Sequence, residues 1–96
     1  MINHKFDLGT TVMTKAISDA INESAVFSLE VNKAFERYQN CDWSDMEFGE
    51  DKELNDRAVK NGNERIFATY DTSKGKIYII TEWDRSYTTI LFPSDY

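Results

Sequence analysis

The sequence is poor in the residues that build covalent links and metal centres, with only Cys41 and His4 representing cysteine and histidine. A single cysteine allows no intramolecular disulfide, which excludes the small secreted domains that disulfides hold together. A zinc site needs several cysteine or histidine ligands, so one chain cannot build one. Two predicted elements separate His4 from Cys41, and we therefore expect no Cys-His nucleophile pair, which requires hydrogen-bond contact.

Glycine and long apolar runs are also scarce. The four glycines stand alone at positions 9, 49, 62 and 75, so the sequence has no glycine-rich phosphate-binding loop. The longest apolar run, Ile77–Ile80, is far shorter than the roughly 20 residues of a membrane-spanning helix. The start, Met1–Lys5, does not resemble a cleavable signal. We expect a soluble, cytoplasmic protein that does not bind membranes.

The overall composition is that of an ordinary globular domain. Apolar residues make up 41% of the chain and charged residues 29%, which excludes a disordered chain without enough apolar surface to fold. The length of 96 residues suits one small domain, and no linker or internal repeat divides it. We predict a single domain over residues 1–96.

The acidic residues are concentrated in one window. Between Asp42 and Asp56 lie seven acids and one base, Lys52, so this window carries the whole net charge of −6. A chain this acidic repels phosphates, and we expect it to bind basic protein surfaces and not nucleic acid. The alternative is a solvated surface that keeps the protein soluble. The acids of the window are Asp42, Asp45, Glu47, Glu50, Asp51, Glu53 and Asp56.

The same window offers no pattern that identifies a catalytic or metal site. The residues Asp42, Asp45, Glu47 and Asp51 could coordinate a hard cation, but their spacing lacks the calcium-loop pattern with its central glycine. No carboxylate pair stands in surroundings that would raise a pKa for acid catalysis. We predict no metal, no cofactor and no catalytic residues.

Apolar spacing predicts one strand followed by three helices in the first two thirds of the chain. Alternating apolar positions predict a strand over 5–12, in which Gly9 marks a bulge or a close backbone approach. A helix over 15–23 follows, with Thr14 as its N-cap, and a longer one begins near Ser28 and ends at Asn40 and Cys41. A third helix, over about 50–61, begins with acidic residues and ends at Asn61-Gly62.

The last third has the alternating pattern of strands. Strands are predicted over 65–71, 76–83 and 87–92, joined by turns at 72–75 and 84–86. Such short turns make an antiparallel meander. The order β-α-α-α-β-β-β predicts a two-layer α+β domain, with an antiparallel sheet, helices packed on one face, and the N-terminal strand paired to an edge of the meander.

The second turn is the most distinctive local sequence. Asp84 and Arg85 lie between the aromatic residues Trp83 and Tyr87. We favour a structural interpretation, in which Asp84 accepts turn hydrogen bonds and Arg85 pairs with an acid. The alternative is an interaction site, because arginine and aromatic residues dominate binding energy at interfaces.

Three parts of the sequence resemble one family. They are the C-terminal string from Ile79 to Tyr96, the start Phe6-Asp7-Leu8-Gly9 with Thr14, and the middle Asp42-Trp43 with Asn55 and Ala58. This pattern is similar to that of small proteins from plasmids, conjugative elements and phages, which often carry names such as "plasmid-related protein" or "type I restriction endonuclease subunit M". An adenine methyltransferase needs a cofactor-binding sheet and a much longer chain, so we interpret the second name as a sign of gene neighbourhood.

The resemblance implies a role in conflict with a bacterial host. Small acidic proteins of mobile elements are often inhibitors of host defence, including anti-CRISPR and anti-restriction proteins. Such an inhibitor can place carboxylates on the Lys/Arg surface that holds DNA or guide RNA, without catalysis. We expect an anti-CRISPR protein that uses the acids of the window, with Trp43 as an anchor and Asp84 and Arg85 as a second, weaker contact.

Two other functions remain open at this point. The protein could be a structural or regulatory interaction module that joins a larger assembly, for example as a homodimer through an edge strand. It could also be an enzyme acting on a small molecule such as a defence signal, although it lacks a His/Cys/Ser constellation.

Overall fold

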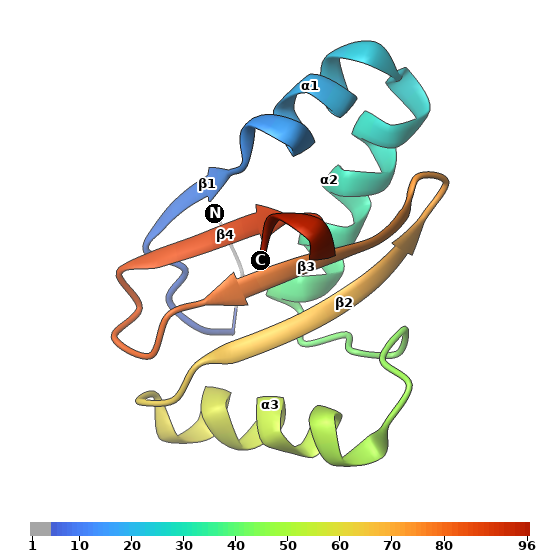
Figure 1. The fold of residues 1–96 in the computed structure, drawn as a ribbon. Coiled ribbons are helices and arrows are strands. Elements are labelled where there is room, and N and C mark those ends of the chain that lie inside the picture. The colour runs from blue at the N-terminus through green and yellow to red at the C-terminus, as the bar shows by residue number, and fades with distance from the viewer. Residues whose placement is uncertain (1–4) are drawn as a thin grey trace.

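The computed structural model describes residues 5–96 and arranges them as a four-stranded sheet with three α-helices (Figure 1). His4 lies outside the described residues. The element order confirms the predicted β-α-α-α-β-β-β succession and the α+β class. The elements are β1 (Thr10–Met13), α1 (Lys15–Glu23), α2 (Ala25–Gln39), α3 (Gly49–Asn61), β2 (Ile66–Thr72), β3 (Gly75–Thr81), β4 (Tyr87–Leu91) and the short 3₁₀ helix η1 (Pro93–Asp95).

The strands lie in the order β1-β4-β3-β2. Strands β2, β3 and β4 form the predicted antiparallel meander, and β1 pairs with the edge strand β4 as predicted. The β1–β4 pair is parallel, so the sheet is mixed and not antiparallel throughout. No hairpin joins these two strands, and the antiparallel direction that a tight turn imposes does not apply to them.

The N-terminal segment departs from the predicted strand over 5–12. Phe6 and Leu8 are buried, but they precede the strand, and all four residues of β1 are exposed. Gly9 explains the difference, because its φ of +63° turns the chain and its amide donates to the Asp7 carboxylate. A Cβ at Gly9 would collide with the backbone of Arg85, so the predicted close approach is confirmed.

The three predicted helices form with small changes at their ends. Thr14 caps α1 by accepting from the amide of Ile17, as predicted. The cap of α2 is Ser24 and not Ser28, because the Ser24 hydroxyl accepts from the amide of Phe27 one turn earlier. Helix α3 ends at Gly62, whose φ of +76° is the left-handed conformation that glycine favours there.

The core fills the space between one sheet face and the helices. Helices α1 and α2 lie on that face, whereas α3 runs along the outer edge, beside β2 (Figure 1). Strand β3 ends at Thr81, before the predicted Trp83, which is 63% exposed. Among residues 5–96, no helix combines the length and apolar character that crossing a membrane requires. The strand residues that face the core are Ile66, Ala68, Tyr70, Ile77, Ile79, Thr81, Thr88 and Ile90.

Candidate functional site

The structure divides the acidic window into internally bonded and free carboxylates. Arg37, at the end of α2, binds two of its members: Nε lies 2.9 Å from Oδ2 of Asp42, and Nη2 lies 3.0 Å from Oδ1 of Asp45. The same guanidinium donates to the Ser44 hydroxyl and lies 5.1 Å from the ring centroid of Tyr70. Its charge therefore offsets part of the acidic window and fixes the loop that follows α2.

These contacts shift the titration of both aspartates. Hydrogen bonds from Arg37, followed by those from Ser44, hold the pKa of Asp42 well below its usual range. Hydrogen bonding to Arg37 also lowers the pKa of Asp45, and the amide of Asp71 donates a further bond to it. Both groups stay ionised as parts of the fold and offer little free charge to a partner.

Trp43 and Asp56 are also used internally. The Trp43 side chain is only 4% exposed and packs edge-to-face on Tyr38, with ring centroids 5.6 Å apart. Its indole nitrogen donates to the Asp56 carboxylate at 2.9 Å. The burial removes Trp43 from the predicted binding surface: it anchors the loop to the protein's own core, where an indole N–H needs a partner.

The four remaining acids form what we call the acidic surface: Glu47, Glu50, Asp51 and Glu53. All four are exposed, and in the described part of the chain none of their carboxylates makes a hydrogen bond or an ion pair. Glu47 lies in the loop before α3 and the other three lie in its first turns, next to Phe48, which is 62% exposed. The acidic surface thus has both free negative charge and an exposed aromatic ring.

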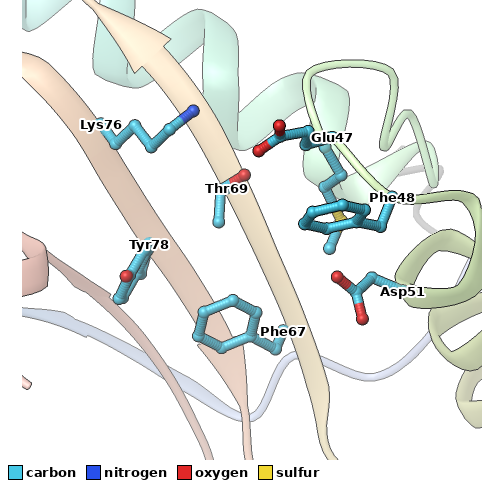
Figure 2. Close-up of a pocket in the computed structure, with 8 residues that line it drawn as sticks. Glu47, Phe48, Asp51, Phe67, Thr69, Lys76 and Tyr78 are labelled. Atoms are coloured by element: carbon cyan, nitrogen blue, oxygen red, sulfur yellow. The ribbon is translucent and has the colours of Figure 1, made fainter.

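A cavity of about 210 Å³ lies beside the acidic surface (Figure 2). Glu47, Phe48 and Asp51 come from the loop and the first turn of α3, and they face side chains of β2 and β3 across it. Phe67 of β2 and Tyr78 of β3 form a wall, with ring centroids 4.8 Å apart. These residues alternate with the core-facing ones, so the cavity lies on the opposite face of the sheet.

Two cations lie near this cavity, and both already contact other side chains, although among the described residues only Lys76 has an anionic partner. Lys76, on its rim, binds the Asp71 carboxylate at 2.9 Å, and this hydrogen bond raises the pKa of the lysine. Arg65 lies against Phe67, with its guanidinium 5.7 Å from the ring centroid, and donates to the hydroxyl of Tyr96. Among the residues that line the cavity, Glu47 and Asp51 carry two negative charges and Lys76 carries one positive charge, so the lining is negative.

Asn55 holds α3 beside the sheet, a role that the sequence did not indicate. It is 3% exposed, its amide nitrogen donates to the Phe67 carbonyl at 2.7 Å, and its oxygen accepts from the Phe67 amide at 3.1 Å. The one available signal was asparagine inside a helix, where its propensity is low unless the side chain has a specific partner.

The hairpin tip has the structural role favoured from the sequence. Asp84 accepts from both the amide and the hydroxyl of Ser86, which lowers the pKa of Asp84. The Arg85 guanidinium donates to backbone carbonyls and not to an acid as predicted, and so joins the tip to the C-terminal end of α3. The exposed aromatic residues of the tip are Trp83 and Tyr87. The four carbonyls belong to Ala58, Glu64, Glu82 and Trp83.

In the described residues, no group of three or more His, Cys, Asp or Glu side chains is placed to hold a metal ion. No protein-family model, curated protein or solved structure matches the chain. Functional inference therefore depends on the acidic surface and the cavity beside it.

Proposed function

We propose that the protein inhibits a host defence complex that targets nucleic acid, by binding the complex directly through the acidic surface. The first complex to test is a CRISPR effector, which would make the protein an anti-CRISPR protein. The observation that supports this is the free charge of the acidic surface. Its four carboxylates are exposed and have no partner within the described residues, whereas Asp42, Asp45 and Asp56 are held by other side chains.

The physical basis of inhibition is competition for a basic surface. Lys and Arg side chains that hold DNA or guide RNA attract a patch of carboxylates, and long-range steering speeds the encounter. Charge at an interface contributes more to association rate and specificity than to affinity, so the apolar neighbours matter as well. Phe48 and Leu54, which are 62% and 50% exposed, supply apolar area beside the charges.

The test is capture of CRISPR effector complexes from a bacterial lysate by the tagged protein, with washes at low and high salt. The test variant carries Glu47→Gln, Glu50→Gln and Glu53→Gln. The matched control carries Glu23→Gln, Glu36→Gln and Glu64→Gln, three exposed glutamates outside the window. We expect salt-sensitive capture by the wild type and the control, and its loss in the test variant. Equal capture by both variants would exclude the acidic surface as the binding site. No capture at all would exclude the proposed inhibitor function.

A second candidate function is self-association through β1. The β2 edge of the sheet is partly occupied by Asn55 and Asp45, which bond to the backbone of Phe67 and Asp71. At the other edge β1 is exposed along its length, with Val12 and Met13 at 40% and 43%. An open edge strand can pair with a second copy. Sedimentation at several concentrations tests this, and a monomer throughout would exclude it.

A further inference from the structure

We propose that the cavity beside the acidic surface is an arginine pocket, which receives the guanidinium group of an arginine side chain presented by a partner protein. The cavity lies between the start of α3 and the outer faces of β2 and β3 (Figure 2). This inference deepens the proposed function, and the identity of the partner that carries the arginine rests on that function.

The lining supplies both kinds of contact that a guanidinium makes. The carboxylates of Glu47 and Asp51 border the cavity and have no partner in the described part of the chain. A guanidinium is a planar set of N–H donors that suits carboxylate acceptors. The rings of Phe48, Phe67 and Tyr78 line the same space, and aromatic faces attract cations, most often arginine.

The protein already binds one of its own arginines in this way. The guanidinium of Arg37 lies between the carboxylates of Asp42 and Asp45 and 5.1 Å from the ring centroid of Tyr70. Two carboxylates, an aromatic ring and the Ser44 hydroxyl together hold this guanidinium. The cavity also combines two carboxylates with aromatic rings, and within residues 5–96 these carboxylates are unpaired and no arginine lines the cavity.

The dimensions of the cavity suit such a group. An apolar cavity of about 150 Å³ is large enough to hold benzene. The volume here is about 210 Å³, and a guanidinium has fewer heavy atoms than benzene. The cavity therefore has room for the group and for part of the methylene chain that carries it, which would pack against Met46 and Phe48.

The backbone of β2 adds an acceptor. Asn55 bonds to the outward-facing backbone groups of Phe67, and Asp45 bonds to the amide of Asp71. By strand alternation, the amide and carbonyl of Thr69 project from the same edge, between these two positions. Thr69 lines the cavity, so its carbonyl can accept from an entering guanidinium.

Among the residues that the structure describes, Lys76 is the one cation that lines the cavity, and its removal should affect arginine binding in the opposite direction from removal of a carboxylate. Its ammonium pairs with Asp71, but its charge still opposes an entering guanidinium. Removing that charge with Lys76→Gln should therefore tighten arginine binding. Removing a carboxylate from the rim should weaken it.

The experiment is an NMR titration of the full chain with a blocked pentapeptide that has a central arginine between glycines, compared with its citrulline and lysine analogues. We expect amide shifts centred on Phe48, Phe67, Thr69 and Tyr78 with the arginine peptide. Citrulline has nearly the same shape without the charge, and it should produce no comparable shifts. Equal binding of the citrulline or the lysine peptide, or no shifts with arginine, would overturn the proposal.

Substitutions of residues that line the cavity test whether the arginine peptide binds there. Glu47→Gln and Asp51→Asn should each raise the Kd about threefold, as for a partly exposed ion pair, while Lys76→Gln should lower it about twofold. Phe48→Ala should raise the Kd about threefold through the lost ring contact. Glu53→Gln is the matched control, because it removes one charge from the acidic surface outside the cavity lining. An equal loss of affinity in this control would overturn the proposal in favour of general electrostatic attraction.

The titration contains no defence complex, so it can fail independently of the proposed function. Arginine binding at the cavity without capture of any effector would support the arginine pocket and contradict the inhibitor function. Capture of an effector, without amide shifts at the cavity when the arginine peptide is added, would support the inhibitor function and overturn the arginine pocket.

Discussion

The buried side-chain amide of Asn55 forms two hydrogen bonds with the backbone of Phe67, at 2.7 Å to its carbonyl and 3.1 Å from its amide. In this way one side chain of α3 satisfies the backbone groups that a neighbouring strand would otherwise engage. Unpaired groups at a sheet edge invite pairing with another chain. Asn55 therefore closes part of the β2 edge and also holds the middle of α3 against it, and α3 carries three of the four residues of the acidic surface.

Replacement of Asn55 should destabilise the fold. Asn55→Ala leaves the amide and carbonyl of Phe67 without their partners in a partly buried place, and we expect a loss of about 2–4 kcal/mol in the free energy of unfolding. Urea unfolding followed by tryptophan fluorescence measures it. Asn61→Ala, at the exposed end of the same helix, is the control and should change stability by less than about 0.5 kcal/mol. Similar losses in the two variants would contradict the role of Asn55.

Gly9 is the position where a single methyl group should be most disruptive. Its φ is +63°, and an added Cβ would occupy the space of the backbone carbonyls of Arg85 and Ser86. Gly9→Ala combines backbone strain with a backbone clash, and we expect it to cost more than about 2 kcal/mol. Gly49→Ala is the control, because Gly49 has open space and begins a helix, so alanine should be neutral or stabilising there. A Gly9→Ala variant as stable as the control would contradict the close approach.

The secondary structure was largely readable from the sequence because it depends on local pattern. Helix α1 begins and ends as predicted, since its cap at Thr14 and its apolar spacing are both local signals. The strand predicted over 5–12 was wrong at its start for a non-local reason. Phe6 and Leu8 do alternate and are buried, but the chain turns at Gly9, where it passes close to the backbone of Arg85 at the other end of the chain.

The candidate site could be predicted only in part from the sequence. The acidic window was visible as charge, but Arg37 lies just outside it, and only the fold shows that this one guanidinium binds both Asp42 and Asp45. Trp43 looked like an exposed anchor because its neighbours are polar, yet it is buried through contacts with distant residues. The cavity combines α3 with β2 and β3, and no local pattern predicts such a meeting of elements.

A buried chain of hydroxyl groups connects α2, β3, β4 and the N-terminal segment. The hydroxyls of Tyr38 and Thr81 lie 2.6 Å apart, those of Thr81 and Thr88 lie 2.8 Å apart, and Thr88 donates to the Leu8 carbonyl at 2.6 Å. Because Thr88 donates its proton to Leu8, it accepts from Thr81, which in turn accepts from Tyr38. Burial raises the pKa of Tyr38, so its hydroxyl stays protonated and can donate.

This direction predicts unequal effects along the chain of hydroxyls. Thr81→Val removes the acceptor of a buried tyrosine hydroxyl. Thr88→Val leaves the Thr81 hydroxyl without its acceptor and the Leu8 carbonyl without its donor. We expect each to cost about 2–3 kcal/mol. Tyr38→Phe removes only the terminal donor and should cost about 1 kcal/mol. Urea denaturation provides the ranking, and a larger loss for Tyr38→Phe than for either valine variant would contradict the assigned direction.

The Arg37 contacts predict a particular loss of stability in acid. Both Asp42 and Asp45 have a pKa below the ordinary 3.8, chiefly through hydrogen bonds from Arg37. The unfolded chain therefore binds more protons than the folded one as the pH falls below about 4, and folding becomes less favourable there. Their contribution is fully present above the unfolded pKa and is lost as the pH falls toward the lowered, folded-state values. Arg37 remains charged throughout, because the same hydrogen bonds raise its pKa.

The double variant Asp42→Asn/Asp45→Asn isolates this contribution. It removes both titrating groups, so the difference in unfolding free energy between about pH 7 and about pH 3 should be smaller than in the wild type. Glu23→Gln/Glu36→Gln is the matched control: it removes two exposed carboxylates that have no side-chain partner in the described residues, and it should keep the pH dependence of the wild type. Urea midpoints at the two pH values measure the effect. A double variant with the full acid sensitivity of the wild type would show that the Arg37 cluster does not control acid stability, and would place its origin among the other carboxylates of the chain.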